Sequence, residues 1–188
     1  MAAFQRTIPV RFAHCDPAAI VFYPRYFEMI AALVEDWFEE GLQASAPRLM
    51  YHRGIVTPTV HFTVDFLNAA HFGDQLTFTL WVKRIGHTSC ELLIEASHRG
   101  KIAMRVKQVL VFALERTRRP TPIAPDIVKR MKRYLCTSER VLEPRAPMAR
   151  AGKTPPPDRL RPGVIARAPA LRAAEPAQPA KSTKRTTG

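Results

Sequence analysis

Residues 24–40 carry the strongest helical pattern in this sequence. Hydrophobic side chains recur at three- and four-residue spacing from Phe27 to Phe38, and acidic side chains take much of the remaining surface of that helix. Pro24 suits the first turn of a helix, because its missing N–H would have no partner there, and Gly41 suits a helix end. The pattern predicts one long amphipathic helix, bulky enough to be the central helix of a small domain.

Alternating hydrophobic and polar side chains predict β-strands before and after this helix. Tight turns at residues 98–101 and around Gly86 join the last three strands, and Pro9 indicates an edge or a bulge in the first strand. Residues 47–54 are predicted to be a polar connection. The order of elements predicts an α+β fold, an antiparallel meander with one helix lying on one face. The predicted strands span residues 6–12, 56–67, 75–85, 89–98 and 101–114, and a short helix follows at about residues 125–135.

The net charge of +13 is unevenly distributed along the 188 residues. Residues 144–188 hold ten Lys or Arg and only two acidic residues, together with nine of the 17 prolines. Such a segment cannot bury enough hydrophobic area to offset its ordering entropy. The sequence therefore predicts a folded domain at residues 1–143 and a basic, Pro/Ala-rich, disordered tail at residues 144–188. The tail is either a solubilising extension or an arm that binds anions or a partner.

Signals for membranes, secretion and cofactors are missing from the sequence. No hydrophobic stretch approaches the roughly 20 residues that span a bilayer, and the N-terminus does not resemble a secretory signal. Cys15, Cys90 and Cys136 are odd in number and widely spaced, which predicts neither a disulfide framework nor a zinc site and favours the cytoplasm. With no GxGxxG, P-loop or HExxH motif, we expect no metal and no redox cofactor.

One acidic residue, Asp16, lies in a connection whose downstream neighbours are almost all hydrophobic, FAHCDPAAIVFYPRY at residues 12–26. A carboxylate in such a place either caps backbone amides or takes part in chemistry. The stretch resembles the active-site signature of the 4-hydroxybenzoyl-CoA thioesterase family of hotdog-fold proteins, in which an aromatic residue and a short polar pair precede D-P-A-G-I-V-[FWY]-Y-P-N-Y. The resemblance covers about residues 5–136 and includes the segment at residues 51–66.

The resemblance implies a hotdog fold, in which an antiparallel sheet of about five strands wraps around a long central helix. It also implies hydrolysis of an acyl-CoA thioester, with Asp16 as the catalytic carboxylate and the backbone N–H of Tyr23 aimed at the thioester carbonyl. Elementary chemistry agrees, because Pro24 has no N–H, and the N–H of Tyr23 with the dipole of that helix end would stabilise an oxygen that gains negative charge. Two roles stay open for the carboxylate: it attacks the thioester carbon, or it draws a proton from an attacking water.

The chain departs from the family pattern at three places. Ala13-His14 replaces an acidic pair, so His14 either orients Asp16, shuttles a proton, or is an exposed loop residue. Arg25 replaces the family asparagine and either faces solvent or helps to hold a phosphate. The helical turn at residues 29–32 lacks the acid that binds a ring hydroxyl in hydroxybenzoyl-specific enzymes. A pocket without that acid should prefer an unsubstituted ring or an alkyl chain, because burying an unpaired hydroxyl costs about 1–3 kcal/mol.

Four further residues are candidates for substrate binding. Thr59 and His61 lie on the strand that, in hotdog dimers, approaches the site from a neighbouring subunit, and their alternate positions predict that they share a face. Lys83 and Arg84 precede the place where the hydroxybenzoyl enzymes carry a basic run for the CoA phosphates. The alternatives are a packed or surface histidine at position 61 and ordinary strand-end charges at positions 83 and 84. The candidate site residues are thus Asp16 and Tyr23 for catalysis and His14, Arg25, Thr59, His61, Lys83 and Arg84 for binding.

These features together predict a cytoplasmic acyl-CoA thioesterase that acts on a short or aromatic acyl group, such as a benzoyl or hydroxybenzoyl group. CoA is part of the substrate, and no cofactor is expected. Exposed sheet edges predict a homodimer or a homotetramer. One alternative is a hotdog protein that binds acyl-CoA or acyl carrier protein without turnover. Another is a binder of nucleic acid or of an anionic surface through residues 144–188, whose binding would fall steeply with salt.

Overall fold

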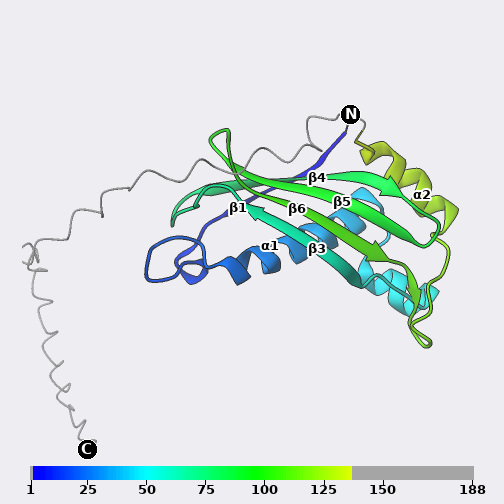
Figure 1. The fold of residues 1–188 in the computed structure, drawn as a ribbon. Coiled ribbons are helices and arrows are strands. Elements are labelled where there is room, and N and C mark those ends of the chain that lie inside the picture. Colours follow the sequence, from blue (N-terminus) through cyan, green and yellow to red (C-terminus); the bar gives the residue numbers. More distant parts are fainter. Residues whose placement is uncertain (1, 137–188) are drawn as a thin grey trace, which may run out of the picture. The chain divides into compact units, whose positions relative to one another are not determined.

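The computed structural model describes residues 2–136, in which an antiparallel five-stranded sheet packs against a long helix, α1 (Tyr23–Asp36) (Figure 1). A shorter helix, α2 (Pro125–Met131), follows the last strand. The strands are β1 (Phe4–Pro9), β2 (Ile55–Val56), β3 (Thr59–Phe66), β4 (Gln75–Ile85), β5 (Ser89–His98), β6 (Lys101–Val111) and β7 (Ala113–Leu114). Short helical turns lie at Phe12–His14, Trp37–Gly41, Arg48–His52 and Lys132–Tyr134.

The strands of the main sheet follow the order β1-β4-β5-β6-β3, and all neighbours are antiparallel. Strands β4, β5 and β6 form the predicted meander, but the prediction of a meander through all four long strands was wrong, because β3 pairs with β6 at the far edge. The connection after β3 crosses the end of the sheet, where the N–H groups of Leu67 and Asn68 donate to the carbonyl of Ala103 at 2.8 and 3.1 Å. This connection places residues 67–70 beside the loop that holds Asp16.

Two of the predicted strands are interrupted. The strand expected at residues 56–67 breaks at Pro58, which has no N–H to donate to the ladder, although its carbonyl accepts the N–H of Val111 at 3.0 Å. The strand expected at residues 101–114 breaks at Phe112. The separated ends pair with each other as β2 and β7, a two-stranded sheet of their own.

The core lies between α1 and the inner face of the sheet. Trp37 and Phe38 are buried, at 0% and 3% exposure, in a π-helical turn that continues α1 as the sequence predicts. Gly41 ends that turn, and a Cβ there would lie 2.7 Å from the ring of Trp37, so only glycine fits. Each large side chain buried in this way contributes about 1.5–3 kcal/mol to folding. The buried residues of α1 are Tyr26, Met29, Ile30, Leu33 and Val34.

The segment predicted as a polar connection, residues 47–54, contains a helical turn instead. Leu49 is buried at 2% exposure within the turn Arg48–His52. Leu49, Met50 and Tyr51 are consecutive and so show neither a helical nor an alternating period, which is why the pattern could not predict this turn.

The predicted tail at residues 144–188, and with it the predicted domain boundary, lies outside the described residues. Within residues 2–136, no helix is both long enough and hydrophobic enough to cross a membrane.

Candidate active site

The loop between β1 and α1 holds Asp16 by its backbone and by its side chain. The N–H of Asp16 donates to the carbonyl of Ile20 at 3.0 Å, and the carbonyl of Asp16 accepts the N–H of Ala19 at 2.9 Å. The carboxylate Oδ1 accepts the N–H of Ala18 at 2.8 Å. This is the turn expected for a carboxylate that caps backbone amides. The turn uses one carboxylate oxygen, and no group in the described residues donates to the other.

Helix α1 begins at Tyr23 after an extended Phe22, and no side chain caps it. Pro24 has no N–H, and the N–H of Arg25 donates back to the carbonyl of Phe22 at 2.9 Å. Among the described residues, no acceptor contacts the N–H of Tyr23. The first amide of this 14-residue helix therefore offers an unpaired donor at the positive end of the helix dipole.

A cavity of about 430 Å³ brings Asp16 and Tyr23 together. Its walls come from the loop before α1, from the first turn of α1, and from the connection that follows β3. Most of these side chains are hydrophobic, and two aromatic rings, those of Tyr26 and Phe66, pack with centroids 5.7 Å apart. The lining residues are Asp16, Ile20, Val21, Phe22, Tyr23, Tyr26, Phe66, Leu67, Asn68, Ala69 and Ala70.

The other two candidates near the loop lie outside this cavity. His14 accepts the N–H of Arg11 through its Nδ1 at 3.0 Å, and its carbonyl accepts the N–H of Phe22 at 2.9 Å, so it stabilises the loop rather than contacting Asp16. Arg25 is exposed, and its Nη1 donates to both carboxylate oxygens of Glu28 at 2.8 and 2.9 Å. Roles for His14 and Arg25 in binding substrate stay predictions.

The prediction that Thr59 and His61 share a face was wrong. Thr59 pairs with Leu110 and His61 pairs with Val109, because the register shifts between them. Paired residues lie on the same face of a sheet, and Val109 and Leu110 are neighbours that point to opposite faces. Thr59 therefore lies on the same face as buried Leu110, although Thr59 itself is exposed, and its Oγ1 accepts from Nε2 of buried Gln108 at 2.8 Å. His61 points outward, with its Nε2 3.2 Å from the hydroxyl of Thr63.

Lys83 and Arg84 lie at the far end of β4. Strand β4 starts at Gln75, close to the loop of Asp16, and Lys83 is eight residues further on, about 26 Å along the strand. Lys83 also donates to Glu91 at 2.7 Å. Neither cation lines the cavity of its own subunit, and their contact with the CoA phosphates stays a prediction that requires a neighbouring subunit.

A family model described as the thioesterase-like superfamily matches residues 10–131. The chain belongs to this superfamily. The match begins at the end of β1, includes the Asp16 loop and α1, and ends with α2, so it covers the whole arrangement that forms the cavity.

Two curated relatives of this thioesterase-like chain carry names of CoA thioester hydrolases. A 1,4-dihydroxy-2-naphthoyl-CoA hydrolase of Nostoc punctiforme is 28% identical over 118 residues, which cover 60% of this chain and 77% of the relative. A 4-hydroxybenzoyl-CoA thioesterase of Pseudomonas sp. strain CBS-3 is 28% identical over 111 residues, which cover 56% of this chain and 79% of the relative. The predicted family and class of enzyme, a thioester hydrolase, are thus confirmed.

A solved structure confirms the hotdog fold of this thioesterase-like chain. A 4-hydroxybenzoyl-CoA thioesterase variant, crystallised in complex with 4-hydroxybenzoyl-CoA, superposes with a TM-score of 0.65 at 24% identity. The match covers 69% of this chain and 98% of that one. The long helix against a five-stranded antiparallel sheet is the arrangement that the sequence predicts.

The fold brings to the thioesterase-like site residues that sequence reasoning missed. Tyr26 lies one helical turn after Tyr23 and is only 4% exposed; burial raises the pKa of its phenol, and the Ala70 backbone beside the hydroxyl partly offsets that rise. Asn68 enters from the end of β3, where its side-chain amide donates to the carbonyl of Ile102 at 2.7 Å. The i, i+3 spacing from Tyr23 could have identified Tyr26. No local pattern indicates Asn68, because it reaches the site through tertiary structure.

Cys15 precedes Asp16, but its thiol is not prepared for nucleophilic attack. Burial raises the pKa of Cys15, and the nearby Asp16 carboxylate raises it further. A thiol with a raised pKa holds less of the reactive thiolate near neutral pH. The structure thus leaves Asp16 as the acidic residue of this cavity.

Proposed function

We propose that this protein hydrolyses an aromatic acyl-CoA to the free acid and CoA, with Asp16 as the catalytic carboxylate and the N–H of Tyr23 as the oxyanion donor. The observation that carries the proposal is that one cavity contains both the Asp16 carboxylate and the start of α1. An unpaired helix-end donor stabilises an oxygen that gains negative charge, and one such donor typically contributes about 3–4 kcal/mol to lowering the barrier.

The proposed reaction breaks the bond between the acyl carbon and sulfur and adds the elements of water. On one route, Asp16 takes a proton from a water molecule, and the oxygen of that water attacks the acyl carbon. On the other, Asp16 attacks directly to give a mixed anhydride, which water then opens. On both routes the thiolate leaves and takes up a proton, and Asp16 ends as it began. Rapid quenching with mass spectrometry separates the routes, because only direct attack produces an acylated peptide that contains Asp16.

The lining of the cavity supports an aromatic acyl group. The rings of Phe22, Tyr23, Tyr26 and Phe66 all contribute to it, and flat rings pack well against aromatic edges and faces. The turn of α1 at residues 29–32 carries no acid: Met29 and Ile30 are buried in the core, and the two alanines are exposed. We therefore propose that a ring hydroxyl is not required, although the curated relatives are named for hydroxylated substrates.

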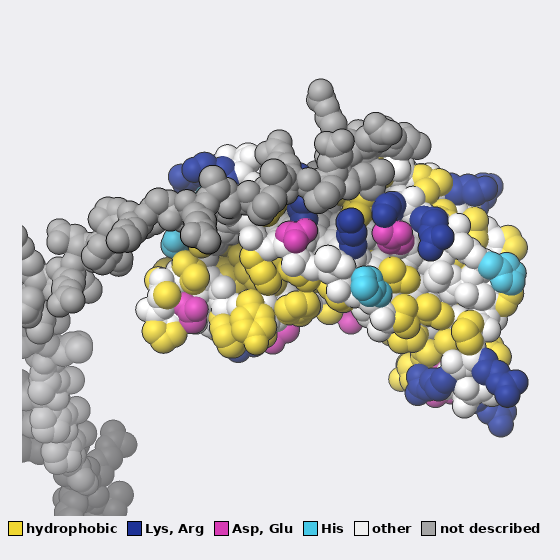
Figure 2. All heavy atoms as spheres, viewed as in Figure 1, with side chains coloured by type: hydrophobic (Ala, Val, Ile, Leu, Met, Phe, Trp, Pro, Cys, Tyr) yellow, Lys and Arg dark blue, Asp and Glu magenta, His cyan; other side chains and the backbone are white. Residues whose placement is uncertain are grey.

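We also propose that two copies of the chain associate through β3. This strand is the last in the sheet, so one of its edges has no partner within the described chain. Hydrophobic side chains gather on the surface over the start of α1 and over β3 (Figure 2), including Phe27, Val60 and Phe66 at 38%, 59% and 51% exposure. A second copy would pair the edge and cover this surface.

The chemistry needs water but no metal and no redox cofactor. Cys15 and Cys90 are free thiols, which supports a reducing compartment such as the cytoplasm. Removal of residues 144–188 should leave the activity intact, because every residue assigned to the reaction lies between positions 16 and 70.

A panel of acyl-CoA substrates with a thiol-trapping reagent tests the proposed function. We expect release of CoA from benzoyl-CoA and related aromatic thioesters at higher kcat/KM than from acetyl-CoA or long-chain acyl-CoA. Calorimetric titration with benzoyl-CoA, run in parallel, detects binding. Tight binding without release of CoA would instead identify a non-catalytic acyl-CoA-binding protein.

A further inference from the structure

A second cavity, of about 470 Å³, lies next to the candidate active site. The two cavities share Asn68 and Ala69, in the connection after β3. The second cavity extends from these residues to the β5–β6 hairpin, where Arg99 and Lys101 flank Gly100. The two cavities therefore adjoin at the connection that follows β3.

The cations of this second cavity are available to a ligand. Within residues 2–136, neither Arg99 nor Lys101 forms an ion pair or a side-chain hydrogen bond, whereas Lys83 and Arg25 are engaged with acids. Unpaired cations at the mouth of a cavity attract an anion, and they do so without first breaking an ion pair.

The acid in the second cavity is already engaged. Asp74 accepts the backbone N–H of His71 at 2.8 Å, and its Oδ1 lies 3.3 Å from Nε2 of His98. Its carbonyl accepts the N–H of Val10 at 2.8 Å, which ties this cavity to the end of β1. Asp74 thus orients the loop and His98, and Arg99 and Lys101 leave the cavity with an excess of positive charge.

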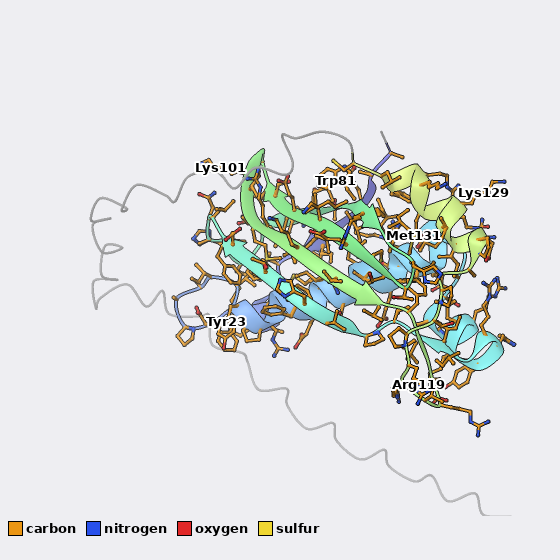
Figure 3. All side chains as sticks on the ribbon, turned by 45° about the vertical axis from the view of Figure 1, so that its right-hand side comes forward. Tyr23, Trp81, Lys101, Arg119, Lys129 and Met131 are labelled. Atoms are coloured by element: carbon orange, nitrogen blue, oxygen red, sulfur yellow. The ribbon has the colours of Figure 1, made fainter. Side chains whose placement is uncertain are left out.

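The second cavity is close to the proposed chemistry, whereas the other basic clusters are not. Lys101 is two residues from Ala103, whose carbonyl binds the N–H of Asn68, so Lys101 lies about 7 Å from that contact along β6. Tyr23 and Lys101 lie at the same end of the molecule, and Arg119 and Lys129 lie at the opposite end (Figure 3). The β5–β6 hairpin is therefore a basic segment at the same end of the subunit as the cavity of Asp16.

We propose that this second cavity binds the phosphate groups of the CoA half of the substrate, through Arg99 and Lys101 of the same subunit that supplies Asp16. The proposal rests on the proposed thioesterase function and specifies where its substrate is held. In a CoA thioester the pantetheine arm separates the reacting carbonyl from the first phosphate, so the phosphates must lie in a neighbouring site. The sequence instead suggests Lys83 and Arg84 for that role, and the two assignments are directly comparable.

The test uses two substrates that share the thioester but differ in phosphate, benzoyl-CoA and S-benzoyl-pantetheine. We expect Arg99→Gln/Lys101→Gln to raise KM for benzoyl-CoA about tenfold or more, with kcat nearly unchanged, because two charge-assisted contacts are lost. The same variant should hydrolyse S-benzoyl-pantetheine like the wild type. The matched control, Arg119→Gln/Lys129→Gln, removes one arginine and one lysine from the opposite end of the subunit and should leave both KM values unchanged.

Three results would overturn the assignment: an unchanged KM for benzoyl-CoA in Arg99→Gln/Lys101→Gln, an equal rise for both substrates, or the loss appearing in the control instead. Direct titration of wild type and both variants with CoA decides the subsite independently of turnover. If the wild type hydrolyses neither substrate but binds CoA in a way that depends on Arg99 and Lys101, the thioesterase proposal fails and the subsite stands.

Discussion

The Oδ1 of Asp16 accepts the backbone N–H of Ala18 at 2.8 Å, so a turn two residues long sets the direction of the carboxylate. Because of this bond, Asp16 can stabilise the turn and still present its carboxylate to the cavity. The turn holds one oxygen, while the side chain as a whole lines the cavity that begins at Tyr23. A carboxylate that is held in place loses less conformational freedom when the reaction begins.

Replacement of Asp16 by asparagine separates these two roles. The amide oxygen of Asn can still accept the N–H of Ala18, so the loop and the melting temperature should be preserved. An amide can neither attack the acyl carbon usefully nor take a proton from water, so kcat should fall at least about 100-fold. Steady-state assays with the best substrate of the panel, together with calorimetry of unfolding, measure both effects.

Glu28→Gln is the matched control for that experiment. It also neutralises one acid near the start of α1, but Glu28 is exposed and pairs with Arg25 outside the cavity. Its kcat should stay close to that of the wild type. Equal activity of Asp16→Asn and Glu28→Gln would exclude Asp16 from the chemistry.

Ala19 adopts a left-handed backbone conformation, with φ of 59°, at the position where the family signature has glycine. A residue with a Cβ costs roughly 1–2 kcal/mol there, and glycine avoids that cost but adds entropy to the unfolded chain. Ala19→Gly should therefore raise the free energy of unfolding, by about 0.5 kcal/mol. Ala18→Gly, at the neighbouring position without positive φ, should lower it. Urea titration of both variants checks the opposite signs.

The alternating and helical patterns predicted most of the fold because the spacing of hydrophobic residues within one strand or helix shows which of its faces is buried. Strands β4 and β5 match the predicted ranges, 75–85 and 89–98, and α1 begins one residue before its predicted start. The family signature likewise placed Asp16 and Tyr23 in one cavity. Features that depend on pairing between distant segments were beyond the pattern: the position of β3 beside β6, and the bulge that turns Thr59 away from His61.

The second cavity was missed for the same reason. His98-Arg99-Gly100-Lys101 reads as an ordinary hairpin, and only the crossing of residues 67–70 over the end of the sheet places it beside the active site. The sequence suggests Lys83 and Arg84 only by their position relative to a motif, and the length of β4 separates them from Asp16 of their own subunit. Proximity across strands therefore has to come from the structure.

The contact between Asp126 and Arg53 should stabilise the folded state only while the Asp126 carboxylate is ionised. Its side chain accepts two hydrogen bonds from Arg53, at 3.1 and 2.9 Å, and this contact lowers the pKa of Asp126, with a smaller contribution from the charge of Arg130. A lowered pKa in the folded state gives stability that is present above the ordinary pKa near 3.8 and is lost as pH falls through the folded value. The pair is more than a third exposed, so we expect it to contribute about 0.5 kcal/mol to the free energy of unfolding.

Urea unfolding of wild type and Asp126→Asn at pH 7 and pH 3 measures this contribution. The variant should lose less stability between the two pH values than the wild type does, and equal losses would contradict the assignment.

Val60 tests the proposed association through β3. It is 59% exposed and lies on the strand whose outer edge has no partner in the described chain. A lysine there would place a charge on the hydrophobic surface and would oppose strand pairing. Light scattering with size-exclusion chromatography should give a dimer or a higher even multiple of the 21.2 kDa chain mass for wild type. The same measurement should give the single-chain mass for Val60→Lys.

Leu114→Lys, at a residue 42% exposed on β7, is the matched control and should keep the wild-type mass. If Val60→Lys also keeps that mass while remaining folded, the subunits associate through another surface.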